Sequence, residues 1–134
     1  MGNSEKYQTQ IFVLELGNST LTKSELKRMH SEYNQMYFGG RLSMPDFKFI
    51  NAKRPFGRFR ADKKTSEIGI SAYRKGWSEE FLKDTLIHEM IHQYVYECMS
   101  GCRYSLVQHG LQFHFMRCRL KRKYGLNISG GAVF

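Results

Sequence analysis

The residues with the clearest chemical meaning form the pentapeptide His88-Glu89-Met90-Ile91-His92. On a helix, positions i and i+4 lie on the same face, so both imidazoles can reach one metal ion. Glu89 would lie beside that ion without binding it and could accept a proton from the attacking water. Neutral imidazole ligands with one coordination position left open are typical of catalytic zinc. The spacing therefore predicts a Zn²⁺ site in which Glu89 is the general base.

Chance matches to such a pentapeptide occur, and the alternative is that both histidines are ordinary core or surface residues. The chain has only five histidines, and two of them stand at ligand spacing around a glutamate. We therefore favour the metal site.

A catalytic zinc site needs a third protein ligand, and the sequence restricts the choice. A metzincin pattern would place glycine at position 95 and histidine at position 98, where this chain has valine and cysteine. Cys98 could bind zinc but is disfavoured, because without that glycine the helix has no easy place to turn back to the metal. A thermolysin-like site uses a downstream glutamate, and the chain has none after Glu97. His109 and His114 remain, and they lie about 140° apart on a helix, so they cannot share one position. We favour His109, because Gly110 allows close approach to another helix, with His114 as the alternative.

Three helices and a small sheet are expected to position these residues. Thr22 and Glu25 form a capping box for the first helix, and Gly39-Gly40 supplies its end. His30 is expected at the surface beside the apolar stripe of this helix. The stripe follows three- and four-residue steps and consists of Leu26, Met29, Tyr33 and Met36.

Two further helices are expected to carry the candidate metal ligands. Ser78 is the predicted N-cap of a helix that runs through both motif histidines to about Cys98. A third helix is predicted over roughly residues 106–124, with His109 in its first turns and Gly125 as its stop.

Residues 42–71, between the first two helices, have the pattern of short strands separated by turns. Phe47 and Phe49, for example, alternate with a lysine. Connections this short predict an antiparallel meander, because parallel strands need long crossovers. The segment Thr9–Leu16 is expected to be a strand or an arm. The fold class is thus α+β, with an N-terminal helix, a small antiparallel sheet, a histidine-motif helix and a third-ligand helix.

Length and composition set the context for the site. A chain of 134 residues with 41% hydrophobic residues is expected to form one globular domain. We assign residues 1–20 to an extension or strand and residues 21–134 to the domain. The longest apolar run, Ile11–Leu14, is far too short for a membrane span or signal peptide. Three cysteines at uneven spacing favour a reduced, cytoplasmic protein.

The chain is basic, with 21 Lys and Arg against 12 Asp and Glu and a net charge of +9. This balance favours a polyanionic partner such as nucleic acid, and DNA binding would place the protein at the nucleoid. Interleaved Phe56 and Phe59 would suit base stacking. The alternative is a solvated strand edge and helix C-terminus, where basic residues are common anyway. The candidate contacts are Arg54, Arg58, Arg60, Lys63 and Lys64 in one cluster and Arg117, Arg119, Lys121, Arg122 and Lys123 in another.

Taken together, the pentapeptide and the later His109-Gly110-x-x-Phe113 resemble the SprT-like (Spartan-like) zinc metalloprotease family, which includes DNA-repair proteases. Residues 33–42 resemble the end of the family's first helix and the start of its first strand. Residues 85–87 also match the family pattern, and the resemblance covers about residues 21–124.

The resemblance implies a minimal zincin fold, zinc held by His88, His92 and His109, and Glu89 as general base. In characterised members it implies cleavage of proteins bound or crosslinked to DNA. This chain lacks the paired cysteines of the C-terminal zinc ribbon that several members carry. Candidates for stabilising the oxyanion, among which the sequence does not choose, are Tyr73, Tyr94, Arg103 and Tyr104.

Two other functions stay open at this point. One is a nucleic-acid-binding module whose zinc is structural or catalytically idle, and the other is a zinc hydrolase with a non-peptide substrate. Glu89 argues against the first, because a purely structural zinc has no use for an adjacent base.

Overall fold

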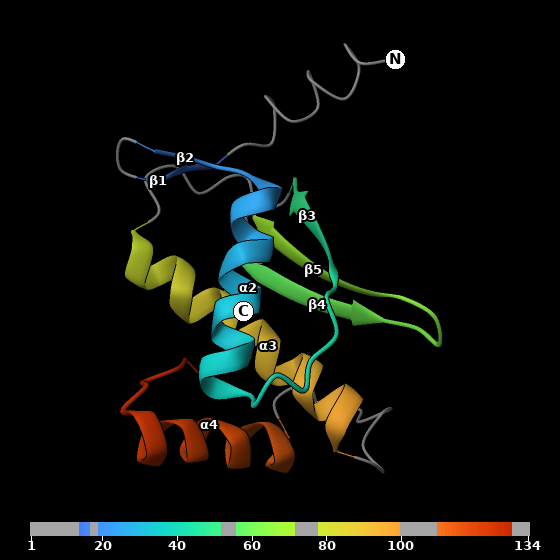
Figure 1. The fold of residues 1–134 in the computed structure, drawn as a ribbon, viewed down its shortest axis with the longest axis vertical. Coiled ribbons are helices and arrows are strands. Elements are labelled where there is room, and N and C mark those ends of the chain that lie inside the picture. Colours follow the sequence, from blue (N-terminus) through green and yellow to red (C-terminus); the bar gives the residue numbers. More distant parts are fainter. Residues whose placement is uncertain (1–13, 17–18, 52–55, 72–77, 100–109, 130–134) are drawn as a thin grey trace.

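A computed structural model describes residues 14–16, 19–51, 56–71, 78–99 and 110–129, and their architecture is α+β (Figure 1). Two short strands, β1 (Leu14–Leu16) and β2 (Ser19–Leu21), pair antiparallel before the first described helix. β1 is the described end of the strand predicted over residues 9–16, and the rest of that segment lies outside the described residues. The second strand, β2, was not predicted.

Helix α2 (Lys23–Tyr37) starts where its capping residues predict. The hydroxyl of Thr22 accepts a hydrogen bond from the Glu25 amide at 3.2 Å, which satisfies one of the open amides of the first turn. After the helix, Gly39 and Gly40 adopt positive φ angles of 64° and 71°, which glycine reaches without strain. The predicted limits of this helix are therefore confirmed.

The inward face of α2 differs from the predicted apolar stripe. Its buried residues are Leu26, His30 and Asn34, whereas Met36 is 54% exposed. The prediction that His30 lies at the surface is wrong. Both polar side chains can be buried because they have partners: His30 Nε2 lies 2.8 Å from the side-chain oxygen of Gln93, and the Asn34 amide bonds the backbone of residue 42.

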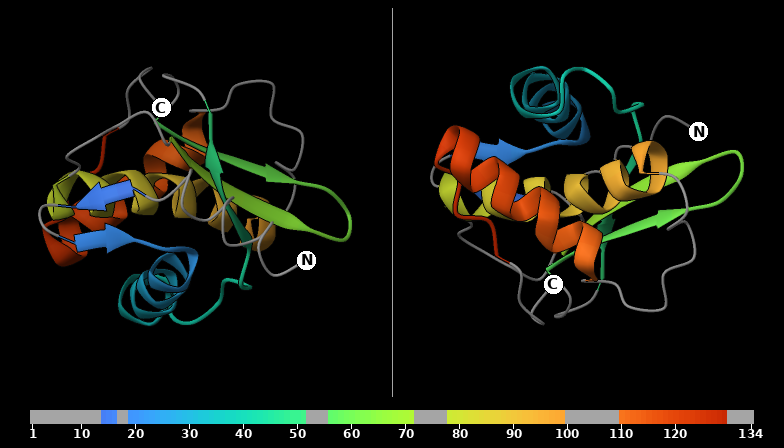
Figure 2. Two further views of the ribbon diagram at one scale, coloured as in Figure 1. Left: turned by 90° about the horizontal axis from the view of Figure 1, so that it is seen from above. Right: turned by 90° about the horizontal axis from the view of Figure 1, so that it is seen from below.

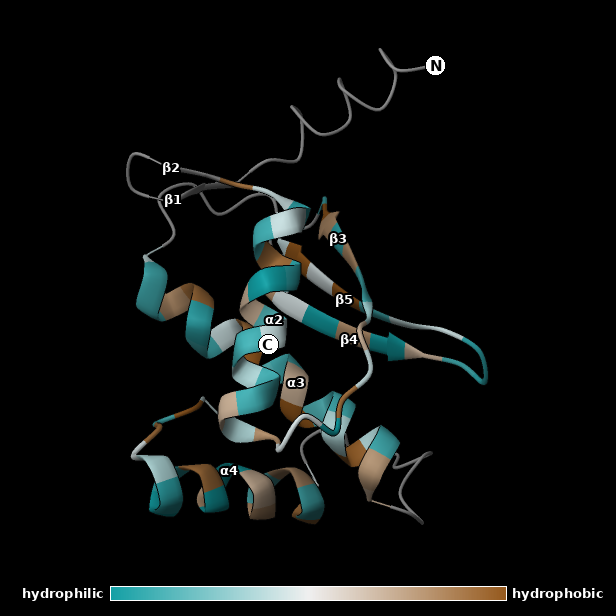
Figure 3. Cartoon of the chain, in the orientation of Figure 1, coloured by the Kyte–Doolittle hydropathy of each residue, from teal (hydrophilic) through white to brown (hydrophobic). Residues whose placement is uncertain are grey.

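The main sheet contains β3 (Asp46–Ile50), β4 (Gly57–Ala61) and β5 (Ser66–Ser71) in the order β3-β5-β4. β4 and β5 pair antiparallel across a hydrophilic turn (Figure 3). β3 and β5 pair parallel, so the predicted antiparallel meander is wrong. The reason is that residues 51–65, including the whole of β4, serve as the crossover that parallel pairing requires.

Helix α3 (Glu79–Cys98) lies between the main sheet and helix α4 (Leu111–Tyr124), as the two views of Figure 2 show. The Ser78 hydroxyl caps α3 by accepting from the Phe81 amide at 3.1 Å, as predicted. Helix α4 begins later than the predicted residue 106, with Gly110 as its N-cap, and ends at Gly125 in the left-handed conformation. In the described parts of the chain, no helix is long and apolar enough to cross a membrane.

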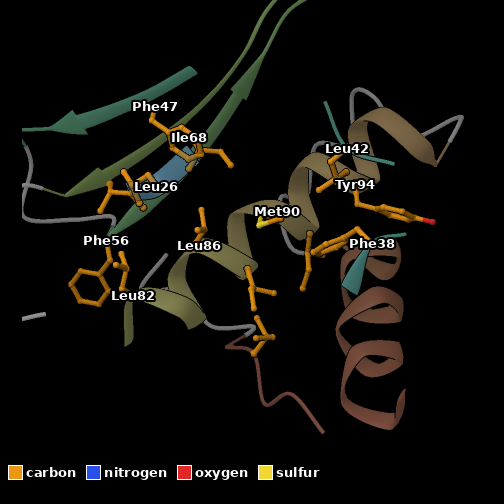
Figure 4. Packing of buried hydrophobic residues seen from close by; sticks show 14 of the residues in the cluster. Leu26, Phe38, Leu42, Phe47, Phe56, Ile68, Leu82, Leu86, Met90 and Tyr94 are labelled. Carbon is orange, nitrogen blue, oxygen red and sulfur yellow. The ribbon is translucent and has the colours of Figure 1, made fainter. Parts of the chain in front are cut away.

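The hydrophobic core lies around α3. Leu82, Leu86 and Met90 of this helix share one cluster with Ile68 of β5 and with Phe56, which directly precedes β4 (Figure 4). From residue 85 to residue 91 every side chain of α3 is buried, because the helix is covered on opposite sides. The first four residues of the histidine motif, His88 to Ile91, are therefore buried, and His92 is half-buried.

Candidate metal centre

The two motif histidines lie one turn apart on α3, as their spacing predicts. The ring centroids of His88 and His92 are 5.1 Å apart, with an angle of 66° between the ring planes. Phe113 of α4 packs against both rings, with centroid separations of 4.8 Å and 4.5 Å. Helix α4 therefore covers the histidine pair with an aromatic side chain that is itself buried.

The tautomer of His88 follows from its hydrogen bond. Nδ1 of this buried ring lies 2.5 Å from the carbonyl oxygen of Ser129. A carbonyl only accepts, so Nδ1 carries the proton and donates, which leaves the ring's lone pair on Nε2. A neutral imidazole in this state, with its other nitrogen bonded to a carbonyl, is the form that zinc-binding histidines adopt. The chemistry of the donors therefore fits a metal.

Glu89 points away from solvent, with only 2% of its surface exposed. Within the described structure its Oε2 has no hydrogen-bond partner. Burial of the carboxyl group raises the pKa of Glu89 to about 8. A buried carboxyl group without a partner is costly for a fold, so its place beside a histidine pair points to a function.

Gly57, the first residue of β4, makes room for this carboxyl group. A Cβ atom at position 57 would lie 2.9 Å from Cγ2 of Thr85 and 3.1 Å from Oε2 of Glu89. Both distances are shorter than ordinary van der Waals contact, so a side chain here would displace one of these groups. Sequence reasoning missed this contact, because the pairing of Gly57 with α3 depends on tertiary packing.

The predicted third ligand, His109, lies outside the described residues. The alternative, His114, is on α4, where its Nδ1 accepts a hydrogen bond from Nε of Arg117 at 3.3 Å. Among the described residues no three His, Cys, Asp or Glu side chains are grouped to hold a metal. Neither His114 nor Cys98 therefore joins the motif histidines there, and the prediction of His109 stays a prediction.

Of the four candidates for stabilising the oxyanion, only Tyr94 is described. It is buried, and its hydroxyl accepts a hydrogen bond from Nη1 of Arg41 at 2.9 Å. The other three, Tyr73, Arg103 and Tyr104, lie outside the described residues.

The basic residues predicted to contact nucleic acid fall into two surface regions, except for two half-buried arginines. Nη2 of the half-buried Arg58 lies 3.6 Å from Oε1 of Glu67. Arg117, also half-buried, donates a hydrogen bond from Nη1 to the carbonyl of Ile128 at 3.4 Å. Arg54 lies outside the described residues. The exposed members are Arg60, Lys63 and Lys64 near the β4–β5 turn and Arg119, Lys121, Arg122 and Lys123 on α4.

These features define an α+β protein with a histidine pair and a buried carboxyl group on its central helix. The SprT-like family matches residues 26–130, and the chain belongs to this family. The matched range contains both motif histidines, Glu89 and His109. Membership is consistent with a metallopeptidase, since the family is generally zinc-dependent. A search of curated proteins finds no match.

Proposed function

We propose that this protein is a zinc-dependent metallopeptidase in which His88, His92 and His109 hold the metal and Glu89 is the general base. The observation that carries the proposal is the Glu89 carboxyl group, buried and without a hydrogen-bond partner in the described structure, next to a histidine in its metal-binding tautomer. A structural zinc site would not require such a group.

The chain's own residues supply the proton chemistry. Zinc, when bound, supplies a Lewis acid that polarises the peptide carbonyl and lets water ionise near neutral pH. Glu89 accepts the proton of the attacking water and delivers it to the amine nitrogen that leaves as the C–N bond breaks. The burial of Glu89 keeps bulk water away from this transfer.

The position of β4 supports a peptide substrate over a small non-peptide one. Among the described strands, β4 has only β5 as a neighbour, so its other edge is unpaired within that part of the chain. Gly57, at the start of this strand, lies against the Glu89 side chain. An extended peptide can add to an unpaired strand edge through main-chain hydrogen bonds, which here would bring it close to the general base.

We further propose that the substrates are proteins bound or crosslinked to DNA. The support is the family membership together with the exposed basic residues of α4 and the β4–β5 turn. Lysine and arginine side chains in such groups neutralise phosphates and give sequence-independent affinity.

The proposal is tested in two steps. The first measures bound zinc, and the second measures cleavage of a DNA-binding protein in the presence and in the absence of DNA. Glu89→Gln is expected to retain zinc and lose hydrolysis, because the amide cannot accept the proton. His114→Gln is the matched control and is expected to remain active.

Full activity of Glu89→Gln would contradict the role of Glu89. Cleavage that does not depend on DNA would favour a general peptidase. Zinc binding without cleavage of any protein would favour an idle or structural zinc, or a non-peptide substrate.

A further inference from the structure

The chain segment that follows α4 returns to the histidine motif. Gly125 turns the chain at the end of the helix, and Ile128 is buried with only 5% of its surface exposed. The next residue, Ser129, meets α3 through its backbone. The C-terminal segment 126–129 is therefore anchored beside the metal-binding helix.

Two side chains of α3 hold Ser129 at opposite ends of its backbone. The Ser129 amide donates to Oδ1 of Asp84 at 3.0 Å, and its carbonyl accepts from Nδ1 of His88 at 2.5 Å. Asp84 and His88 are at positions i and i+4, so they lie on the same face of the helix. A single residue thereby links a carboxylate to the ring of a predicted metal ligand.

A third contact fixes the same segment from the side of α4. Arg117 donates to the carbonyl of Ile128 at 3.4 Å. The segment is thus held by both helices, and the carbonyl that faces His88 has little freedom to turn away. Because this carbonyl selects the Nδ1–H tautomer, its position decides whether the lone pair of Nε2 is available for a metal.

We propose that Asp84 is a positioning residue for the metal centre, acting through the backbone of Ser129 to fix the tautomer and orientation of His88. This inference rests on the proposed function, since it takes His88 to be a metal ligand. Outer hydrogen-bond partners of zinc-binding histidines typically change metal affinity by about 10- to 100-fold when they are removed.

The test compares Asp84→Ala and Asp84→Leu with Asp84→Asn in the full chain. The Asn side chain keeps an oxygen that can accept from the Ser129 amide, whereas Ala and Leu have none. Leu also matches the branching of Asn, so it serves if the Ala variant does not fold. Glu80→Ala is the matched control, because it removes an exposed carboxylate from the same helix.

The first measurement needs no metal. Spectra of ¹⁵N-labelled histidine report which ring nitrogen of His88 carries the proton in the metal-free protein. Wild type, Asp84→Asn and Glu80→Ala are expected to show Nδ1–H, and Asp84→Ala or Asp84→Leu a mixture of tautomers. A single Nδ1–H tautomer in every variant would overturn the inference, whatever the outcome for the proposed peptidase.

The second measurement is zinc affinity, obtained by competition with a chromophoric chelator. Asp84→Ala or Asp84→Leu is expected to bind zinc about 10- to 100-fold more weakly than wild type, and Asp84→Asn close to it. Wild-type affinity together with a lower melting temperature of the metal-free protein would show a purely structural role and overturn the inference. The proposed function fails separately, if wild type binds zinc but cleaves no protein.

Discussion

At the scale of single residues, a buried hydrogen-bond network lies next to the histidine motif, whereas Oε2 of Glu89 and the hydroxyl of Thr85 have no hydrogen-bond partner among the described residues. His30 donates to Gln93, and the amide of Gln93 donates in turn to the Ser43 carbonyl at 2.7 Å and to Glu97 at 3.0 Å. This network joins α2 to the C-terminal half of α3. Because the oxygen of Gln93 can only accept, Nε2 of His30 carries a proton, while Nδ1 is buried without a hydrogen-bond partner among the described residues.

The first prediction concerns the pH dependence of stability. Burial lowers the pKa of His30 below its ordinary value of 6.5, against the opposing effects of the Gln93 hydrogen bond and the charge of Glu97. The unfolded chain therefore takes up the proton first, and the contribution of His30 to stability is lost as pH falls below about 6.5. The free energy of unfolding should decrease between about pH 7 and pH 5 in denaturant titrations.

His30→Gln keeps a donor for Gln93 but does not titrate, so it should flatten this decrease. His114→Gln, on the partly exposed face of α4, is the control and should leave the decrease in place. An unchanged pH dependence in His30→Gln would show that other groups cause it.

At the scale of elements, helix α4 packs over the histidine pair on α3. Phe113 fills this interface, while Phe115, two residues later, is 54% exposed. The same helix therefore offers a buried and an exposed phenylalanine for comparison.

We expect Phe113→Ala to lower the free energy of unfolding by about 3–5 kcal/mol, because it removes a buried aromatic ring. Phe115→Ala should change it by less than about 0.5 kcal/mol. Urea titration of both variants checks this difference. Equal effects would mean that α4 does not depend on Phe113 for its packing.

The contact between β4 and α3 leads to a prediction for the active site. A side chain at position 57 would lie 2.9 Å from the Thr85 methyl group and would push against Glu89. Gly57→Ala is therefore expected to destabilise the fold by about 1–3 kcal/mol. If Glu89 moves by about 1 Å, kcat should fall on the order of 100-fold.

Thr85→Ser removes the clashing methyl group and keeps the hydroxyl. The double variant Gly57→Ala, Thr85→Ser should recover part of the stability, whereas Thr85→Ser alone should keep its activity. Thermal unfolding and peptidase assays of the four proteins measure this coupling. Strict additivity of the two changes would argue against the clash.

At the scale of the whole molecule, the basic charge is concentrated toward the C-terminal end. The chain contains no Asp or Glu from residue 98 onward, and the last turn of α4 carries Lys121, Arg122 and Lys123, all exposed. The helix dipole stabilises cations near the C-terminal end of a helix, so part of this clustering needs no bound ligand.

The proposed DNA contact predicts more than this local effect. Replacing Lys121 and Lys123 by alanine should weaken DNA binding and reduce the slope of affinity against salt by about 1 for each lost phosphate contact. Lys23→Ala with Lys27→Ala, exposed on α2, makes the same change in net charge and should have little effect. Equal weakening in both double variants, measured by titration at several salt concentrations, would indicate only a general charge effect.

The sequence by itself determined the features that depend on neighbours along the chain. Ser78 caps α3 and Thr22 caps α2 through bonds to amides three residues away. The one-turn spacing of His88 and His92 places both on one helix face by the geometry of the helix alone.

Tertiary structure decided what depends on distant partners. Three contacts join residues that are far apart in sequence. They are the parallel pairing of β3 with β5, the hydrogen bond between His30 and Gln93, and the hydrogen bond between His88 and the carbonyl of Ser129. The local sequence pattern does not predict such contacts, because they form only when separate elements pack against one another. The spacing therefore predicted the helix face proposed to bind the metal, and packing decided the tautomer of His88 on that face.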